Sequence, residues 1–222
     1  MNYFIWNNID SRTYGVIPET LPPPSRDPER VDNIIVPGRS GHLTISDDIY
    51  DGQIRVATCG ILDRSLKDTV FAWLKGSGTV TFSNEPTRAY RARITDAIPM
   101  ERVNDVFHAF PVTFDCEPFA YEKTPTVHTL TGTATITNPG TLESLPIITV
   151  TGTGVLTVNG TALTITESGV TINSEIEECY AGSTNKNDKV SGGFPTLSVG
   201  ANVITFGAGI TGAVITGNYR WY

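Results

Sequence analysis

Short runs of alternating apolar and polar residues fill the second half of the chain. The alternation is clearest at 133–137, 147–151, 169–173, 202–206 and 213–222, and Gly, Asn and Pro separate the runs. A period of two is typical of strands with one buried face, and turn residues at every roughly 8 to 12 positions are typical of β-sandwiches. The pattern predicts a β-sandwich of about 100 residues, a size that can fold alone.

The stretch GVLTVNGTALTI (154–165) contributes a hairpin to this sandwich. Leu156 and Val158 alternate with polar residues, Asn159-Gly160 follows, and the alternation then resumes. A type I′ turn needs φ > 0 at both central residues, which Asn and Gly adopt most readily. We therefore expect two strands joined by a two-residue turn.

One segment of the first half has the period of a helix, SLKDTVFAWLKG (65–76). Its apolar residues fall on one side: Leu66, Val70, Phe71, Trp73 and Leu74. Ser65 with Asp68 three residues later resembles a capping box, and Gly76 suits the position after the last turn. The sequence predicts one helix here.

The remainder of the first half has the pattern of strands, at 78–83, 89–97 and 105–118. The last of these places six side chains on one face: Val106, His108, Phe110, Val112, Phe114 and Cys116. Pro111 has no N–H for the ladder, so it predicts a sheet edge or a bulge. The proline-rich segment at 19–30 is expected to be an extended arm or loop.

Composition divides the 222 residues into two domains. The stretch 124–222 holds 14 of the 21 glycines but only 6 acidic and 3 basic residues. Pro125 and the polar residues around it favour a linker over a packed element. We expect domains at 1–124 and 125–222.

The charge and hydropathy patterns exclude several classes of protein. A net charge of -7 argues against specific nucleic-acid binding, which depends on clusters of Lys and Arg. No stretch approaches the ~20 apolar residues of a membrane span, and the first 30 residues lack the apolar region of a signal peptide.

The three cysteines are Cys59, Cys116 and Cys179. Their odd number and wide spacing suggest neither a disulfide framework nor a zinc site. Buried free thiols are the favoured interpretation.

Common catalytic motifs are absent from the sequence. His42, His108 and His128 are scattered, and a lone His within a strand pattern is more often structural than catalytic. His108 is expected to be neutral or hydrogen-bonded on its apolar face.

Two clusters of acidic residues are candidate metal-binding or catalytic sites, but solvent exposure explains each of them more simply. Asp47, Asp48 and Asp51 could contact Ca²⁺, but they lack the order of an EF-hand loop, so a solvated loop at 46–52 is favoured. Glu175, Glu177 and Glu178 could form a paired-carboxylate site. Alternation would place Glu175 and Glu177 on one strand face, where their repulsion favours simple exposure.

The terminal aromatic residues Tyr219, Trp221 and Tyr222 leave two interpretations open. They could stack on a sugar ring, or they could be buried by a strand that closes the sandwich. With these candidates weighed, the sequence assigns no catalytic, cofactor-binding or metal-binding residue.

A series of segments in order along the chain resembles the distal tail proteins (Dit) of phages with long flexible tails. The matching segments are DSRTYG (10–15), VPGRSGHL (36–43), WLKGSGTVTFSNEPTRAYRARI (73–94), FPVTFDCEPFAY (110–121), NPGTLESLPIITVTGTG (138–154), VTINSEIEECY (170–180) and GGFPTLSVGANVITF (192–206). The sequence departs from the family at Asn173, where Asp is frequent, and at Val199, where proline is usual.

The resemblance implies a mainly β fold. It consists of a tail-tube-like N-terminal domain with one helix and a galectin-like C-terminal sandwich. In the last of the matching segments, Pro195 would stop strand pairing, Gly200 would form a tight turn and Asn202 would close it. That segment is therefore expected to be scaffold.

The resemblance also implies a structural virion protein at the distal tip of the tail, made in the host cytoplasm. Six N-terminal domains would form a hub ring around a channel for DNA. The ring would join the major tail tube protein to a tail-associated lysin or tail-tip protein, and the sandwiches can carry receptor-binding or side-fibre proteins. A channel lined by acidic groups would repel phosphates and let DNA slide. No enzymatic activity and no cofactor are implied.

A carbohydrate-binding module for host cell-wall polysaccharide is the alternative function. Galectin-like sandwiches bind sugars, and the C-terminal half has aromatic residues. Only Trp221 among the three tryptophans lies in that half, however, and no set of His, Asn and Arg surrounds it.

Overall fold

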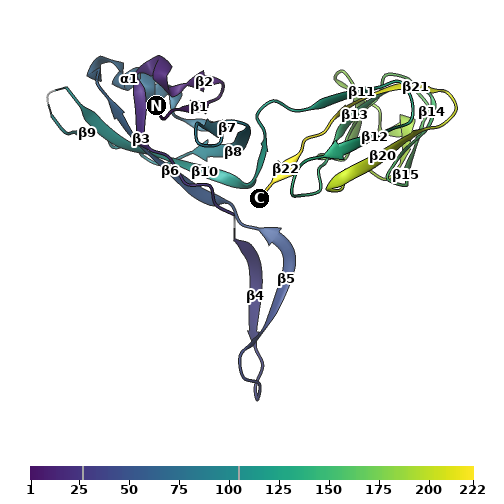
Figure 1. Ribbon diagram of the computed structural model, residues 1–222, viewed down its shortest axis with the longest axis horizontal. Coiled ribbons are helices and arrows are strands. Elements are labelled where there is room, and N and C mark those ends of the chain that lie inside the picture. The colour runs from purple at the N-terminus through teal and green to yellow at the C-terminus, as the bar shows by residue number, and fades with distance from the viewer. Residues whose placement is uncertain (27, 105) are drawn as a thin grey trace. The chain divides into compact units, whose positions relative to one another are not determined.

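The computed structural model describes residues 1–26, 28–104 and 106–222 (Figure 1). The chain folds into two compact units, Met1–Lys123 together with Tyr222, and Thr124–Trp221. Both units are built mainly of antiparallel strands, and α1 (Lys67–Trp73) is the one α-helix among the described residues. The predicted mainly β class is confirmed.

The main sheet of the first unit has the strand order β2-β1-β7-β8-β10-β6-β3, and β9 also pairs with β10. Its strands are β1 (Phe4–Trp6), β2 (Ile9–Asp10), β3 (Val16–Thr20), β6 (Gln53–Ile61), β7 (Gly76–Phe82), β8 (Arg88–Ile94), β9 (Glu101–Arg102) and β10 (His108–Glu122). A separate two-stranded sheet pairs β4 (Glu29–Ile35) with β5 (His42–Tyr50). Short 3-10 helices lie at Ser11–Tyr14 and Arg64–Leu66.

Strand β10 places alternate side chains in the core, as its sequence predicts. Buried residues recur at every second position: His108, Phe110, Val112, Phe114 and Cys116. Val106, predicted to share this face, is 61% exposed because it lies in the turn before the strand. Pro111 lies at a point where β6 is the one strand that pairs with β10 among the described pairings, so β10 is locally an edge strand on its other side.

Aromatic rings form the centre of the first unit. The ring of Phe114 contacts Phe4 at 5.4 Å and Phe82 at 5.5 Å, both edge to face, and Phe4 stacks on Trp73 of α1 at 5.6 Å. Edge-to-face and stacked pairs add to the free energy gained by burial. The helix is thus held on the sheet by Trp73 and by the buried Val70.

The helix begins differently from the prediction. Ser65 forms no capping box with Asp68, because its backbone N–H and hydroxyl both donate to Asp63 Oδ1, at 2.9 and 2.6 Å. The Asp63 side chain therefore closes a turn before the helix, and the hydrogen bonds from Ser65 lower the pKa of that carboxyl. Phe71, predicted on the apolar side, is 37% exposed.

The second unit is a sandwich of two antiparallel sheets, ordered β11-β21-β13-β16-β17-β18 and β12-β20-β14-β15-β19. The strands are β11 (Val127–Leu130), β12 (Ala134–Asn138), β13 (Ile147–Gly152), β14 (Gly154–Val158), β15 (Thr161–Ile165), β16 (Thr171–Asn173), β17 (Glu178–Ala181), β18 (Thr184–Asn185), β19 (Val190–Gly192), β20 (Gly200–Phe206) and β21 (Ile210–Thr216). The short strand β22 (Arg220–Trp221) belongs to neither of these two sheets. A 3-10 helix lies at Asn187–Lys189. Both sheets contribute to the core, with Ile148 and Ile172 from one and Leu156 and Leu163 from the other.

Asparagine side chains fix the turns of the sandwich. Asn159 and Gly160 have φ values of 49° and 87°, as the predicted type I′ turn requires. The Nδ2 of Asn159 donates to Asn202 Oδ1 at 2.5 Å, and Asn202 in turn donates to the carbonyls of Ser198 and Gly200. Gly200 has φ 87°, so the expected tight turn before β20 is present.

Two predicted strands of the second unit are interrupted. Residues 174–177 form a turn before β17, and Glu177 has φ 53°, so Glu175 and Glu177 do not alternate on a strand. The segment 213–222 breaks after Thr216, where Asn218 adopts φ 48°. Tyr219 and Trp221 are buried, and the Tyr219 hydroxyl lies 2.8 Å from His128 Nε2. These two aromatic side chains are therefore not available to stack on a sugar.

None of the described helices is long and apolar enough to cross a membrane.

All three cysteines are buried, as expected from the sequence. Burial raises the pKa of the Cys59 thiol to about 12 and also raises the pKa of Cys179. A thiol reacts as its thiolate, which is nearly absent at such a pKa.

We expect the native protein at pH 8 to show no rapid reaction with Ellman's reagent, and the protein unfolded in guanidinium to show three reactive thiols. Absorbance at the thiolate band of the reagent measures both. A native thiol that reacts at the unfolded rate would contradict the buried placement.

Candidate interaction surface

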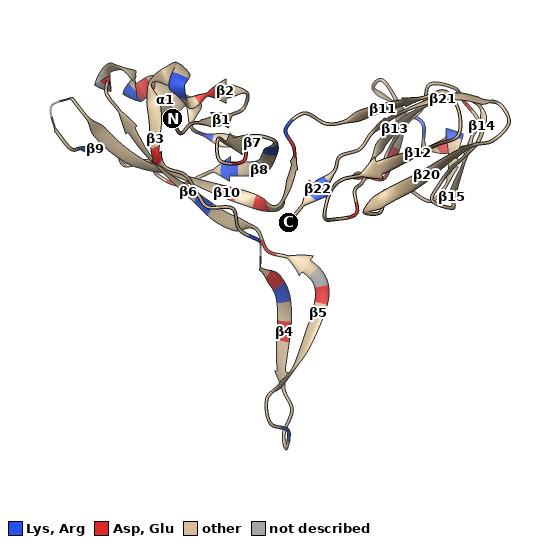
Figure 2. Cartoon of the chain, in the orientation of Figure 1, with Lys and Arg blue, Asp and Glu red and all other residues tan. Residues whose placement is uncertain are grey.

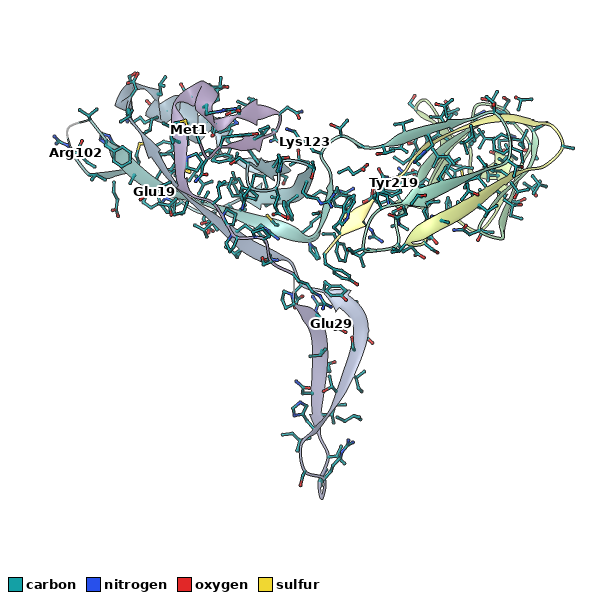
Figure 3. All side chains as sticks on the ribbon, viewed as in Figure 1. Met1, Glu19, Glu29, Arg102, Lys123 and Tyr219 are labelled. Carbon is teal, nitrogen blue, oxygen red and sulfur yellow. The ribbon has the colours of Figure 1, made fainter. Side chains whose placement is uncertain are left out.

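The β4–β5 hairpin, residues 29–50, is the most exposed apolar element of the first unit. Its register places Ile34 opposite Leu43 and Asp32 opposite Ile45. Because opposed and alternate residues share a face, Ile34, Leu43 and Ile45 lie together on one side. Figure 3 shows side chains standing out on both sides of this ribbon, with Glu29 at its base.

Both faces of the hairpin expose apolar side chains. Ile34, Leu43 and Ile45 are 41 to 45% exposed, and Val31 and Ile35 on the opposite face are 40% and 83% exposed. A two-stranded hairpin is at best marginally stable in water without a covered face. Neither strand pairs with another described strand. The hairpin therefore has the properties of an element that is completed by a partner.

Polar contacts hold the base of the hairpin together. Arg30 pairs with Asp51, which raises the pKa of the Arg30 guanidinium through their hydrogen bond, and the Asp51 N–H donates to Pro28 O at 3.1 Å. Thr44 Oγ1 donates to Asn33 Oδ1 across the strands at 2.9 Å. These contacts fix the register but leave the apolar side chains uncovered.

The chain enters the hairpin through an extended segment, residues 21–26, which we call the strap. Arg55 on β6 is only 3% exposed, and its guanidinium donates to Pro23 O at 3.5 Å and Ser25 O at 3.3 Å. Asn84 Nδ2 donates to Pro22 O at 2.8 Å. Arg55 of the sheet and Asn84 of the turn after β7 (Gly76–Phe82) thus donate to the carbonyls of a segment that forms no strand.

Arg55 is itself held by two neighbours. Its guanidinium lies 4.1 Å from the centre of the Tyr90 ring and 4.0 Å from Glu85 Oε2, and the Tyr90 hydroxyl donates to the same oxygen at 2.8 Å. Burial raises the pKa of the Tyr90 hydroxyl, so it remains a donor at neutral pH. The cation, ring and carboxylate form one buried unit under the strap.

A second surface is a groove of about 780 Å³ beside the β-bulge of β10. Arg91, Arg93, Asp115 and Glu117 line it, and Arg91 Nη1 lies 3.8 Å from Glu117 Oε2. Charges of both signs are thus balanced within the groove. Figure 2 shows that the charged residues are denser in the first unit than in the sandwich.

No protein-family model matches the chain, and no curated protein matches it. A solved structure does.

The chain is similar to the crystal structure of the SPP1 Dit (gp 19.1) protein, which is described as a paradigm of the hub adsorption apparatus in phages that infect Gram-positive bacteria. The TM-score is 0.78, the sequence identity is 12%, and the match covers 100% of both chains. At this identity the likeness establishes the fold alone, and it confirms the mainly β, Dit-like fold that the family resemblance implied.

The histidines weighed as candidate residues are not brought together. His42 lies at the start of β5 and His128 on β11, whereas His108 is buried in β10 with neither ring nitrogen near a hydrogen-bond partner among the described residues. No group of three or more potential metal ligands occurs in the described part of the chain.

The segment 46–52 is not the loop that its aspartates suggested. Residues 46–50 belong to β5, with Asp47 exposed on the strand, and Asp51 pairs with Arg30. The side chain of Asp48 lies outside the described residues.

The sequence contained a signal for the hairpin that its polar residues obscured. Val31, Asn33 and Ile35 alternate before PGRSG, and Leu43 and Ile45 alternate after it. Two such runs around a short glycine-containing loop predict a hairpin. The role of Arg55 has no comparable signal, because its partners lie about 30 residues away in both directions.

Replacing Arg55 with alanine is expected to destabilise the first unit by about 3 kcal/mol, because it leaves a partly buried carboxylate without its cation and frees the strap. Urea unfolding followed by Trp fluorescence measures the loss. Arg93→Ala is the control, since Arg93 is exposed and donates to Ser77 at the surface; its effect should stay within about 0.5 kcal/mol. Equal losses in the two variants would contradict the proposed anchoring.

Proposed function

We propose that this protein is a structural subunit of a phage tail hub, placed at the distal end of the tail tube. The observation that carries the proposal is the likeness over the full length of both chains to a Dit protein described as a hub. The motif order along the sequence supports it independently. Neither the structural likeness nor the order of the motifs identifies the function by itself, but both indicate the same kind of protein.

The proposed assembly is a ring of six copies. A closed ring needs two different complementary surfaces on each subunit, because each copy contacts the next head to tail. The β4–β5 hairpin supplies one surface that is incomplete by itself. Burial of its exposed apolar side chains against the neighbouring subunit is the contact expected to hold the ring.

The ring would surround a channel through which DNA passes. Each copy carries a formal charge of -7. A surface with this excess of carboxylates has little attraction for phosphates, so DNA would pass without binding. The tail tube protein on one side and a tail-tip protein or lysin on the other are the proposed partners, and the sandwiches are the proposed galectin-like carriers of receptor-binding or side-fibre proteins.

Electron microscopy of the purified protein, with its mass measured in solution, tests the proposal. We expect rings with six-fold symmetry and a central hole, and six copies of 24.0 kDa give 144 kDa. A protein that stays monomeric at its highest soluble concentration, both alone and with tube protein added, would count against the hub.

Substitutions on one face of the hairpin test how the ring is held. The triple variant Ile34→Thr, Leu43→Thr and Ile45→Thr places β-branched residues, which favour strands, at all three positions but removes apolar surface. Each substitution should weaken the contact between neighbouring subunits by about 1 kcal/mol of association free energy. The three together should lower the association constant about a hundredfold. Sedimentation velocity over a range of concentrations measures the shift from ring to monomer.

Val155→Thr with Val203→Thr is the matched control, because these valines are exposed on strands of the sandwich to a similar degree. The control should assemble like the unmodified protein. If both variants assemble like the unmodified protein, the hairpin is not the contact between subunits.

A further inference from the structure

A pocket of about 230 Å³ opens at one edge of the sandwich, between β19 of one sheet and β17 of the other. Leu163, Cys179 and Val190 form its apolar part, and Phe194 is half-buried beside them. Glu177 and Asn187 add polar groups at the exposed side. None of these residues takes part in the proposed contacts of the ring.

The polar groups of the pocket have a defined arrangement. Asn187 Oδ1 accepts a hydrogen bond from the Cys179 N–H at 2.6 Å, which orients the amide and leaves its Nδ2 group as a donor. Glu177 makes no salt bridge among the described residues, whereas the nearby Glu167 and Asp188 pair with Lys186 and Lys189. The pocket therefore presents carboxyl oxygens as acceptors and an amide group as a donor.

Two glycines keep the adjoining wall bare. A Cβ at Gly192 would lie 2.3 Å from Ala162 O, so the close pairing of β19 with β15 requires glycine there. A Cβ at Gly193 would meet only Thr161 Cγ2, at 3.8 Å, so a side chain would fit sterically. Gly193 thus lines the pocket with backbone atoms alone.

We propose that this pocket binds one hexopyranose unit of a glycan. A pyranose ring has an apolar C–H face that can pack on Phe194, and hydroxyl groups that can donate to Glu177 and accept from Asn187. The volume lies below the ~300 Å³ of sites for drug-sized ligands, which fits one ring and excludes a longer chain.

The polar rim favours a sugar over an apolar side chain from a partner protein. An apolar group would remove water from the carboxylate of Glu177 without replacing its hydrogen bonds, which costs free energy. Sugar hydroxyls replace those bonds. We expect a dissociation constant of about 1 mM for one bound sugar, which corresponds to a binding free energy of about 4 kcal/mol. Six copies in the proposed ring would raise the total affinity by multivalency.

Titration of the full-length, isotope-labelled protein with simple sugars tests the inference. The probes are N-acetylglucosamine, methyl α-glucopyranoside and methyl β-galactopyranoside, and the signals followed are the backbone amides of Gly192 and Gly193. We expect a saturable shift of both amides with at least one sugar. Absence of a saturable shift with all three would overturn the proposal.

Variants separate this pocket from sugar binding elsewhere. Phe194→Ala removes the ring and should weaken binding at least about tenfold. Glu178→Gln is the control, because Glu178 is next to Glu177 but does not line this pocket. Its affinity should not change, and equal affinity in all the variants would also overturn the proposal. Ring formation should be unaffected by these variants, so the outcome is independent of the test of the hub.

Discussion

Alternation along β10 is the constraint on which the first unit depends. This strand of 15 residues pairs with β6, β8 and β9, and every second side chain enters the core. A shift of one residue would turn Phe110 and Phe114 to solvent and Asp115 to the core, so the register has no close alternative. The position of α1 follows, since Trp73 packs on Phe4, which in turn packs on Phe114.

The same strand also sets the position of the hairpin base. Strand β6 pairs with β10 from Gln53 to Ile61, and it carries Arg55 toward the strap. The buried guanidinium of Arg55 thus connects the sheet to the strap, and the strap leads into the exposed hairpin. An element that extends from a folded sheet and exposes apolar side chains on both faces is suited to join one subunit to another. Among the described residues, the sandwich has no two-stranded sheet outside its two main sheets.

Local patterns in the sequence predicted the elements whose signals are contained within a few residues. The Asn159-Gly160 turn, the strand β10 and the helix at Val70 and Trp73 belong to this group. Predictions failed where a nearby side chain competed for the same hydrogen bond. Asp63 Oδ1 accepts the backbone N–H of Ser65 that a capping box would have used. Asn173 Oδ1 accepts the Glu175 N–H in the turn that replaced a predicted strand.

The candidate surfaces were less predictable than the fold. The apolar residues of the hairpin are visible in the sequence, but their exposure depends on the absence of a third strand, which no local pattern specifies. The pocket at Phe194 arises from segments about 30 residues apart that meet only when the two sheets pack. Distant groups of this kind become apparent only in the folded chain.

The burial of all three thiols has a consequence for the lifetime of the proposed particle. A phage tail persists outside the reducing cytoplasm in which it is made, where oxygen oxidises accessible cysteines and can join neighbouring subunits by disulfides. Cys59, Cys116 and Cys179 are each at most 3% exposed. In the proposed ring, neighbouring copies would therefore not be cross-linked through these thiols, and their contacts would stay non-covalent and free to rearrange.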